Sequence, residues 1–179
     1  TSALAAVSAA KATKAQHQVI ATRDYAGKAY EILINLAAQP GADGSNTHPL
    51  LTARSEIKKS ALILVTGDRG LAGAYNANVV TRAEQFLEAI TTPVGIIAVG
   101  RKGRDLMIRR GYNITASFDG IPDGPSFLEV VAIARMAIND YLEGKVDDVF
   151  IAYTDFISLA NRVPRVKQLL PLKPLDLEA

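Results

Sequence analysis

The first 38 residues are an alanine-rich stretch that constrains the fold more than any other part of the chain. Ala stands at twelve of these positions, Pro at none and Gly at one. Because Ala has the highest helix propensity, the stretch predicts one continuous helix over residues 1–38. Such a helix is about 55 Å long, whereas a domain of about 100 residues has a radius of gyration of about 13 Å. The helix is therefore too long to be covered by its own domain.

The side chains spaced four and three residues apart along this stretch are small at its start and larger toward its end. They are Ala5, Ala9, Ala12, Gln16, Val19, Arg23, Ala26, Tyr30, Leu33 and Ala37. Small residues let a second helix approach closely but contribute little stability alone. We therefore predict a coiled-coil-forming helix that needs a partner.

The composition changes after this helix. Residues 39–52 contain Pro40, Gly44 and Pro49, which are typical of turns and linkers. We predict four parts: a long shaft helix over residues 1–38, a linker over 39–57, an α/β globular domain over 58–172 and a tail over 173–179.

Apolar runs of strand length alternate with helical patterns in the globular part. The sequence predicts strands over 61–66, 94–99, 112–118 and 146–156, helices over 76–90 and 126–142, and a loop with a short helix over 100–111. Strands that are apolar on both faces indicate a Rossmann-like, mostly parallel sheet with helices on both faces. Residues 164–172, with Pro near both ends, predict an edge strand hairpinned onto its predecessor.

Composition excludes several classes of function. The chain has 20 basic and 18 acidic residues, so it lacks the excess of cations that nucleic-acid binding requires. With no Cys and two His it cannot build a zinc site, and neither a metal nor a cofactor is expected. No apolar run approaches the roughly 20 residues that span a bilayer, and no signal peptide is predicted. The neighbouring Asp147 and Asp148 are interpreted as facing water.

Two glycine-containing loops are the candidate phosphate sites, because each follows a strand and opens a helix. Residues 67–73 have the spacing GxxGxxG, which matches neither a dinucleotide fingerprint nor a P-loop, and Asp68 would repel a phosphate. We interpret this loop as a tight turn in which Gly allows positive φ. Residues 100–104 carry three cations and suit an anion better, although a surface charge cluster is the favoured interpretation. No catalytic residue can be assigned.

Four segments resemble one protein family. Residues 66–79, TGDRGLAGAYNANV, resemble the S-D-R-G-L-C-G-G-x-N signature of the gamma subunit of rotary proton-translocating ATP synthases. Residues 1–16 are similar to the family's amino-terminal helix, residues 100–112 to its G-x-K-G segment, and residues 147–172 to its Y-T-x-F, P and Q-L-L-P-L run. These segments occur in order and cover nearly the whole chain.

The chain also departs from the family's pattern. Leu4 and Ala6 replace the usual Met residues, Ala72 and Ala74 replace the Cys and second Gly of the signature, and Thr13 stands at a commonly basic position. The family's carboxy-terminal helix has no counterpart after Leu172, so the sequence is expected to be a fragment that lacks it and the start of the first helix. The paired Cys of chloroplast relatives are absent, which favours a bacterial origin.

The resemblance implies a central stalk that transmits torque between the proton-driven c-ring and the catalytic head during ATP synthesis. Its implied partners are the alpha, beta and epsilon subunits and the c-ring, at the cytoplasmic face of the bacterial plasma membrane. It implies no catalytic site, nucleic acid or small-molecule substrate of its own. Lys11, Lys14 and Gln16 are implied to contact the catalytic head, and Asp68, Arg69, Gly70, Gly73 and Asn76 to form a structural signature loop. The alternative is a small phosphate- or nucleotide-binding α/β enzyme that uses the two glycine loops.

Overall fold

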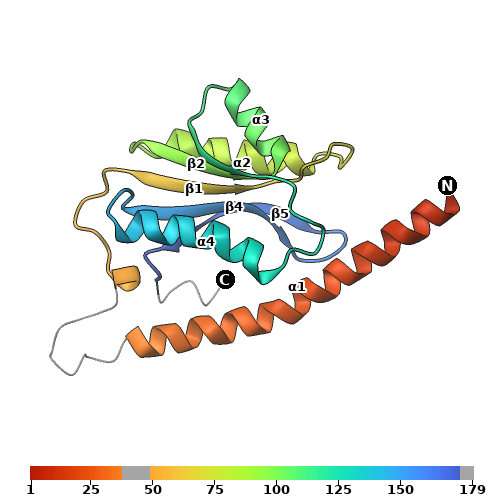
Figure 1. Cartoon of the computed structure of the whole chain (residues 1–179), viewed down its shortest axis with the longest axis horizontal. Helices are drawn as coiled ribbons and strands as arrows, with labels where there is room; N and C mark the ends of the chain where they lie inside the picture. Colours follow the sequence, from red (N-terminus) through yellow and green to blue (C-terminus); the bar gives the residue numbers. More distant parts are fainter. Residues whose placement is uncertain (38–48, 174–179) are drawn as a thin grey trace. The chain divides into compact units, whose positions relative to one another are not determined.

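A computed structural model describes residues 1–37 and 49–173 (Figure 1). Contacts divide the chain into two units, one of Thr1–Thr47 with Lys173–Ala179 and the other of His48–Leu172.

The described part of the first unit is the helix α1 (Ser2–Ala37), which has 36 residues. Its hydroxyl residues return hydrogen bonds to the preceding turn: Thr13 Oγ1 donates to the carbonyl of Ala9, and Thr22 Oγ1 to that of Gln18. Apolar side chains are exposed from end to end, among them Leu4, Ile20 and Ile32. The prediction of one continuous helix is confirmed over Ser2–Ala37, and residue 38, the last of the predicted range, lies outside the described residues.

The second unit is an α/β domain. Its elements in order are the 3₁₀ turn η1 (Pro49–Leu51), β1 (Ser60–Val65), α2 (Tyr75–Ala89), β2 (Val94–Val99), α3 (Arg101–Arg109), β3 (Ile114–Phe118), α4 (Phe127–Leu142), β4 (Asp148–Phe156) and β5 (Arg162–Leu170). The strands form one sheet in the order β3-β2-β1-β4-β5. All neighbours are parallel except β4 and β5, which form an antiparallel hairpin. The predicted mostly parallel sheet and its edge hairpin are confirmed.

Helices cover both faces of this sheet, with α2 and α3 on one side and α4 on the other (Figure 1). The alternation along β1 explains the two layers: Leu62 and Leu64 pack toward α2 and α3, whereas Ala61 and Ile63 pack toward α4. Because both sets are buried, the strand is a continuous apolar run, as expected for a sheet covered on both sides.

The strand order places a topological switch between β1 and β4. The chain moves from β1 outward to β2 and β3, and then returns to add β4 on the other side of β1. In open α/β sheets, ligands bind beyond the carboxyl ends of the strands at such a switch. A functional site is therefore expected at this edge of the sheet.

Candidate functional site

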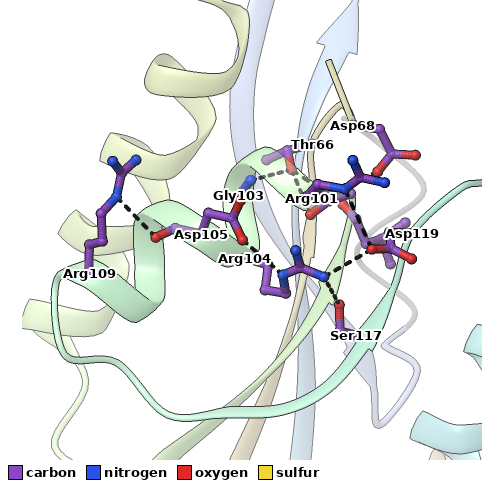
Figure 2. Close-up of polar contacts among 11 residues, drawn as sticks. Thr66, Asp68, Arg101, Gly103, Arg104, Asp105, Arg109, Ser117 and Asp119 are labelled. Carbon is purple, nitrogen blue, oxygen red and sulfur yellow. Dashed lines mark hydrogen bonds and ion pairs between the residues drawn. The ribbon is translucent and has the colours of Figure 1, made fainter. Parts of the chain in front are cut away.

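Three loops meet at the carboxyl ends of β1, β2 and β3. They are the segment that follows β1, the start of α3 and the turn after β3 (Figure 2). Their centre is Thr66, which is buried. Its N–H donates to the Val99 carbonyl at 2.8 Å, and its Oγ1 accepts from the N–H of Gly103 at 2.8 Å. Thr66 therefore joins the ends of two strands to the first turn of α3.

Asp68, in the segment that follows β1, binds both the start of α3 and the turn after β3. Its Oδ1 accepts from the N–H of Arg101, the first residue of α3, at 2.8 Å, and its Oδ2 accepts from the N–H of Gly120 at 2.7 Å. The amino end of a helix, with its unpaired N–H groups and positive dipole, is where an α/β protein holds an anion. In this domain the protein's own carboxylate occupies that position at α3.

Asn76 closes the signature loop onto α2. Its Oδ1 accepts from the Gly67 N–H at 2.8 Å, and its Nδ2 donates to the Arg69 carbonyl at 3.3 Å. Positive φ values occur at Gly73 and at Leu71, whose side chain is fully exposed. The expectation of a tight turn with a glycine at positive φ is confirmed at Gly73, whereas Gly67 and Gly70 do not have positive φ.

Two of the three cations of the second loop, Arg101 and Arg104, are paired with carboxylates. Arg104 Nη1 donates to Asp119 at 2.9 Å, and its Nε donates to Asp105 at 2.9 Å (Figure 2). Arg101 Nε lies 3.7 Å from the same Asp119 carboxylate. The hydrogen bond with Asp105 is the main cause that raises the pKa of Arg104 above its ordinary value. This geometry favours the surface charge cluster over an open anion site.

A groove of about 1190 Å³ lies beside these loops, on the side of the sheet that α4 covers. Its walls are mainly apolar side chains, including Val65, Val99, Ile133 and Ile151. Such a lining suits an apolar chain segment better than a polyphosphate, which requires several convergent donors or cations.

The predicted site residues fall into two sets. Asp68, Arg69, Gly70, Gly73 and Asn76 lie together in the signature loop. Lys11, Lys14 and Gln16 lie on α1 in the other unit, where both lysines are exposed and Gln16 is half-buried.

The predicted site residues do not include Thr66 and Asp119, which hold the loops together. Thr66 is the first residue of the segment 66–79 that resembles the family signature, whereas no local pattern marks Asp119.

The two neighbouring carboxylates before and at the start of β4 are both engaged by the domain. The Asp147 carboxylate accepts from the N–H groups of Lys58 and Lys59 at 2.7 and 3.1 Å, and the N–H of Asp147 donates to the Lys59 carbonyl at 2.8 Å. The next residue, Asp148, is buried. The interpretation that both carboxylates simply face water is therefore wrong, since one holds the segment before β1 and the other lies inside the domain.

The described residues include neither a metal-binding cluster nor a membrane-spanning helix. Within residues 1–37 and 49–173, no group of three or more His, Asp or Glu side chains is placed to hold a metal ion. No helix in these same ranges combines the length and the apolar character needed to cross a bilayer.

Replacing Asp68 by alanine is expected to lower the free energy of unfolding by about 2 kcal/mol, because two backbone N–H groups lose a charged acceptor. Asp68→Asn keeps one carbonyl acceptor and should recover about half of this loss. Urea unfolding of the chain measures both variants. Equal stability of Asp68→Ala and the wild type would contradict the assigned role of the carboxylate.

Comparisons with known proteins give one consistent result. The family model described as ATP synthase matches residues 1–179. The chain is 44% identical over 172 residues to the ATP synthase gamma chain of Moorella thermoacetica, covering 96% of this chain and 60% of the relative. It is 40% identical over 179 residues to that of Staphylococcus saprophyticus, covering 98% of this chain and 61% of the relative. The chain thus spans about three fifths of the length of these relatives.

Among solved structures, the fold is similar to a chain in the cryo-EM structure of the central stalk and c-ring of the Tetrahymena thermophila mitochondrial ATP synthase. The TM-score is 0.54 at 22% identity, and the match covers 89% of this chain and 72% of the other. This similarity supports the architecture described above.

Proposed function

Because the chain belongs to the ATP synthase family, we propose that it is part of a gamma subunit and acts in the central stalk of a rotary ATP synthase. The observation that carries this proposal is the match of nearly the whole chain to gamma chains at about 40% identity. In this role it transmits torque between a proton-driven c-ring and the catalytic head. It works at the cytoplasmic face of a bacterial plasma membrane.

The architecture supports such a role. A helix of 36 residues is about 54 Å long, and its exposed apolar side chains suit burial against other helices or subunits. An asymmetric shaft contacts each surrounding catalytic subunit differently, so each orientation stabilises a different conformation in each subunit. Rotation of the shaft thereby changes which subunit releases ATP. The nucleotide sites belong to the alpha and beta subunits, and epsilon lies beside the sheet domain.

The alternative, a phosphate- or nucleotide-binding enzyme, requires an open anion site at one of the glycine loops. The Asp68 carboxylate lies at the amino end of α3, and the cations Arg101 and Arg104 are paired with Asp119. A phosphate bound there would have to displace one carboxylate and compete with another. We therefore favour the stalk.

Because both glycine loops lack an open anion site, we expect that the isolated chain does not bind nucleotide. Calorimetric titration with ATP, with and without magnesium, should show no saturable heat at concentrations up to about 1 mM. The Asp68→Asn variant is the matched control, since it removes the repelling charge and keeps an acceptor. Saturable binding by the wild type tighter than about 0.1 mM would support the enzyme instead.

A second prediction concerns the amino-terminal half of α1. We propose that Lys11 and Lys14, three residues apart and exposed, face an acidic loop of the catalytic subunits, with Gln16 close by. Reversing both charges replaces attraction by repulsion, so the coupled state should lose about 1 to 2 kcal/mol. In a reconstituted complex, Lys11→Glu with Lys14→Glu should reduce the protons pumped per ATP.

The control for this experiment is Lys28→Glu, which reverses a charge at an exposed position of the same helix. Lys28 lies about 21 Å from Lys14 along the helix axis. The control should leave pumping unchanged. Normal pumping by the double variant would reject the assignment of these two lysines.

A further inference from the structure

Leu71, in the signature loop, combines a strained backbone with a fully exposed side chain. Its φ is 61°, and within residues 1–37 and 49–173 it is the one non-glycine residue with positive φ. An L side chain is crowded in this left-handed region, whereas glycine adopts it freely. Because the side chain of Leu71 is fully exposed, no packing within the described chain compensates for the strain.

The loop that carries Leu71 is held on both sides of it. Before it, the Asp68 carboxylate binds two backbone N–H groups of other loops. After it, the N–H of Tyr75 donates to the Ala72 carbonyl at 3.3 Å, and Asn76 binds back to the loop through both ends of its amide. The leucine therefore projects from a fixed backbone, which reduces the entropy lost when such a residue binds a partner.

Two cations close to Leu71 have no carboxylate partner in the part of the chain that the structure describes. Arg69 is exposed. Lys102 lies against the residue that precedes Leu71, since its Nζ is 3.7 Å from the position that a Cβ on Gly70 would take. Both differ from Arg104, which is paired with carboxylates of this chain. A surface with carboxylates at its border would complement these two cations, and a guanidinium can bind a carboxylate through two hydrogen bonds.

Exposure of a leucine alone would carry no inference, because single exposed apolar side chains are ordinary on protein surfaces. Leu71 differs because glycine at its position would relieve the strain without loss of any contact within the described chain. Strained residues of this kind cluster where a protein binds or acts. The gain that offsets the strain is therefore expected outside this chain.

We infer that Leu71 is an anchor for another protein subunit, which receives it in an apolar pocket bordered by carboxylates. The pocket buries the leucine, and its carboxylates pair with Arg69 and Lys102. This inference rests on the proposed function for the complex in which that subunit occurs. The chemistry of the pocket follows from the loop itself.

The test uses the full-length subunit in the assembled synthase. The photoreactive residue benzoylphenylalanine replaces Ala72, which is exposed and adjoins Leu71. Light should link it to another subunit, in a segment that contains both apolar residues and Asp or Glu. The measured quantities are the yield of this crosslink and, by mass spectrometry, the sequence of the linked segment.

The variant Leu71→Gly removes the anchor and keeps the backbone conformation. The crosslink yield should fall about tenfold or more, because burial of a leucine side chain is lost. Leu71→Met keeps an apolar side chain of similar size and should retain most of the yield.

Charge reversal tests the border of the pocket. Arg69→Glu with Lys102→Glu should lower the yield about fivefold or more, and less so at high salt. Arg109→Glu with Lys59→Glu is the matched control, since both positions are exposed and both precede a strand rather than follow one. The control should leave the yield unchanged.

A separate measurement on the isolated chain tests whether the fold needs Leu71. Leu71→Gly should unfold at a higher urea concentration than Leu159→Gly, the same substitution at an exposed position without positive φ. A lower midpoint for Leu71→Gly would show that the leucine serves the fold and would overturn the anchor.

In the complex, an undiminished crosslink in Leu71→Gly overturns the anchor. The absence of any crosslink to another subunit from the wild-type loop also overturns it, as does a linked segment without Asp or Glu. A full-length subunit that does not assemble with alpha and beta subunits contradicts the proposed function. Assembly with an unchanged crosslink in Leu71→Gly contradicts the anchor alone.

Discussion

Replacing Gly100 by alanine is expected to lower the free energy of unfolding by about 3 to 5 kcal/mol, a large part of the stability of a typical domain. Gly100 precedes α3 with a φ of 99°, a conformation that L side chains rarely adopt. A Cβ placed there would lie 2.0 Å from the carbonyl oxygen of Thr66. That atom belongs to the backbone at the end of β1 and cannot move without disturbing the sheet.

The control for this prediction separates backbone strain from steric clash. Gly111 also has a positive φ, 84°, but a Cβ there meets nothing within 4 Å. Gly111→Ala should therefore cost only the strain, about 1 to 2 kcal/mol. Urea unfolding, followed by near-ultraviolet circular dichroism of the buried Tyr141, measures both variants. Equal losses in the two variants would mean that the contact between Gly100 and Thr66 has no energetic role.

The second large effect is expected at Gly103, inside α3, where the same alanine substitution should lower the free energy of unfolding in one background and raise it in another. A Cβ there would lie 2.6 Å from both Cγ2 and Oγ1 of Thr66. Gly103→Ala should therefore destabilise the wild-type chain by about 1 to 3 kcal/mol. In a Thr66→Ala background both of these atoms are gone, and the remaining close atom is Leu64 Cδ2 at 3.2 Å, the end of a flexible side chain that can move slightly. The same substitution should then stabilise the chain by about 0.5 to 1 kcal/mol, because alanine is the better helix former.

A double-mutant cycle tests this prediction, since the two residues are in direct contact. The hydrogen bond from the Gly103 N–H to Thr66 is absent from both variants that carry Thr66→Ala, so its loss cancels in the comparison. A coupling free energy of about 2 kcal/mol or more is expected. Additive effects would show that α3 can shift away from β1 at little cost.

Most of the fold could be predicted from the sequence, because its signals are local and repeated. The apolar runs of β1 and β2 are too short for helices and are bounded by turn residues, so they are recognisable as strands. In α4, Ser126 and Glu129 form a capping box that marks the start of the helix within one residue of its predicted position.

The contacts within the candidate site could not be predicted, because their partners are distant in the sequence. Asp68 binds backbone N–H groups 33 and 52 residues away, and Arg54 reaches Tyr141, 87 residues away. Without the strand order, an exposed acidic or basic side chain could pair with many distant groups, and the sequence does not show which of them lies close to it. The strictest need for glycine lies outside the signature loop, at Gly100 and Gly103, where the start of α3 approaches Thr66 too closely for a Cβ.

The central claim, that this chain belongs to a rotor, is tested most directly by watching it turn. The full-length subunit, labelled in the β4–β5 turn, is reconstituted with alpha and beta subunits fixed to a surface, and MgATP is added. We expect the label to rotate in one direction, at a rate that follows ATP hydrolysis. A head that hydrolyses ATP around a bound but stationary subunit would contradict it, as would a subunit that does not assemble with the head and binds nucleotide alone.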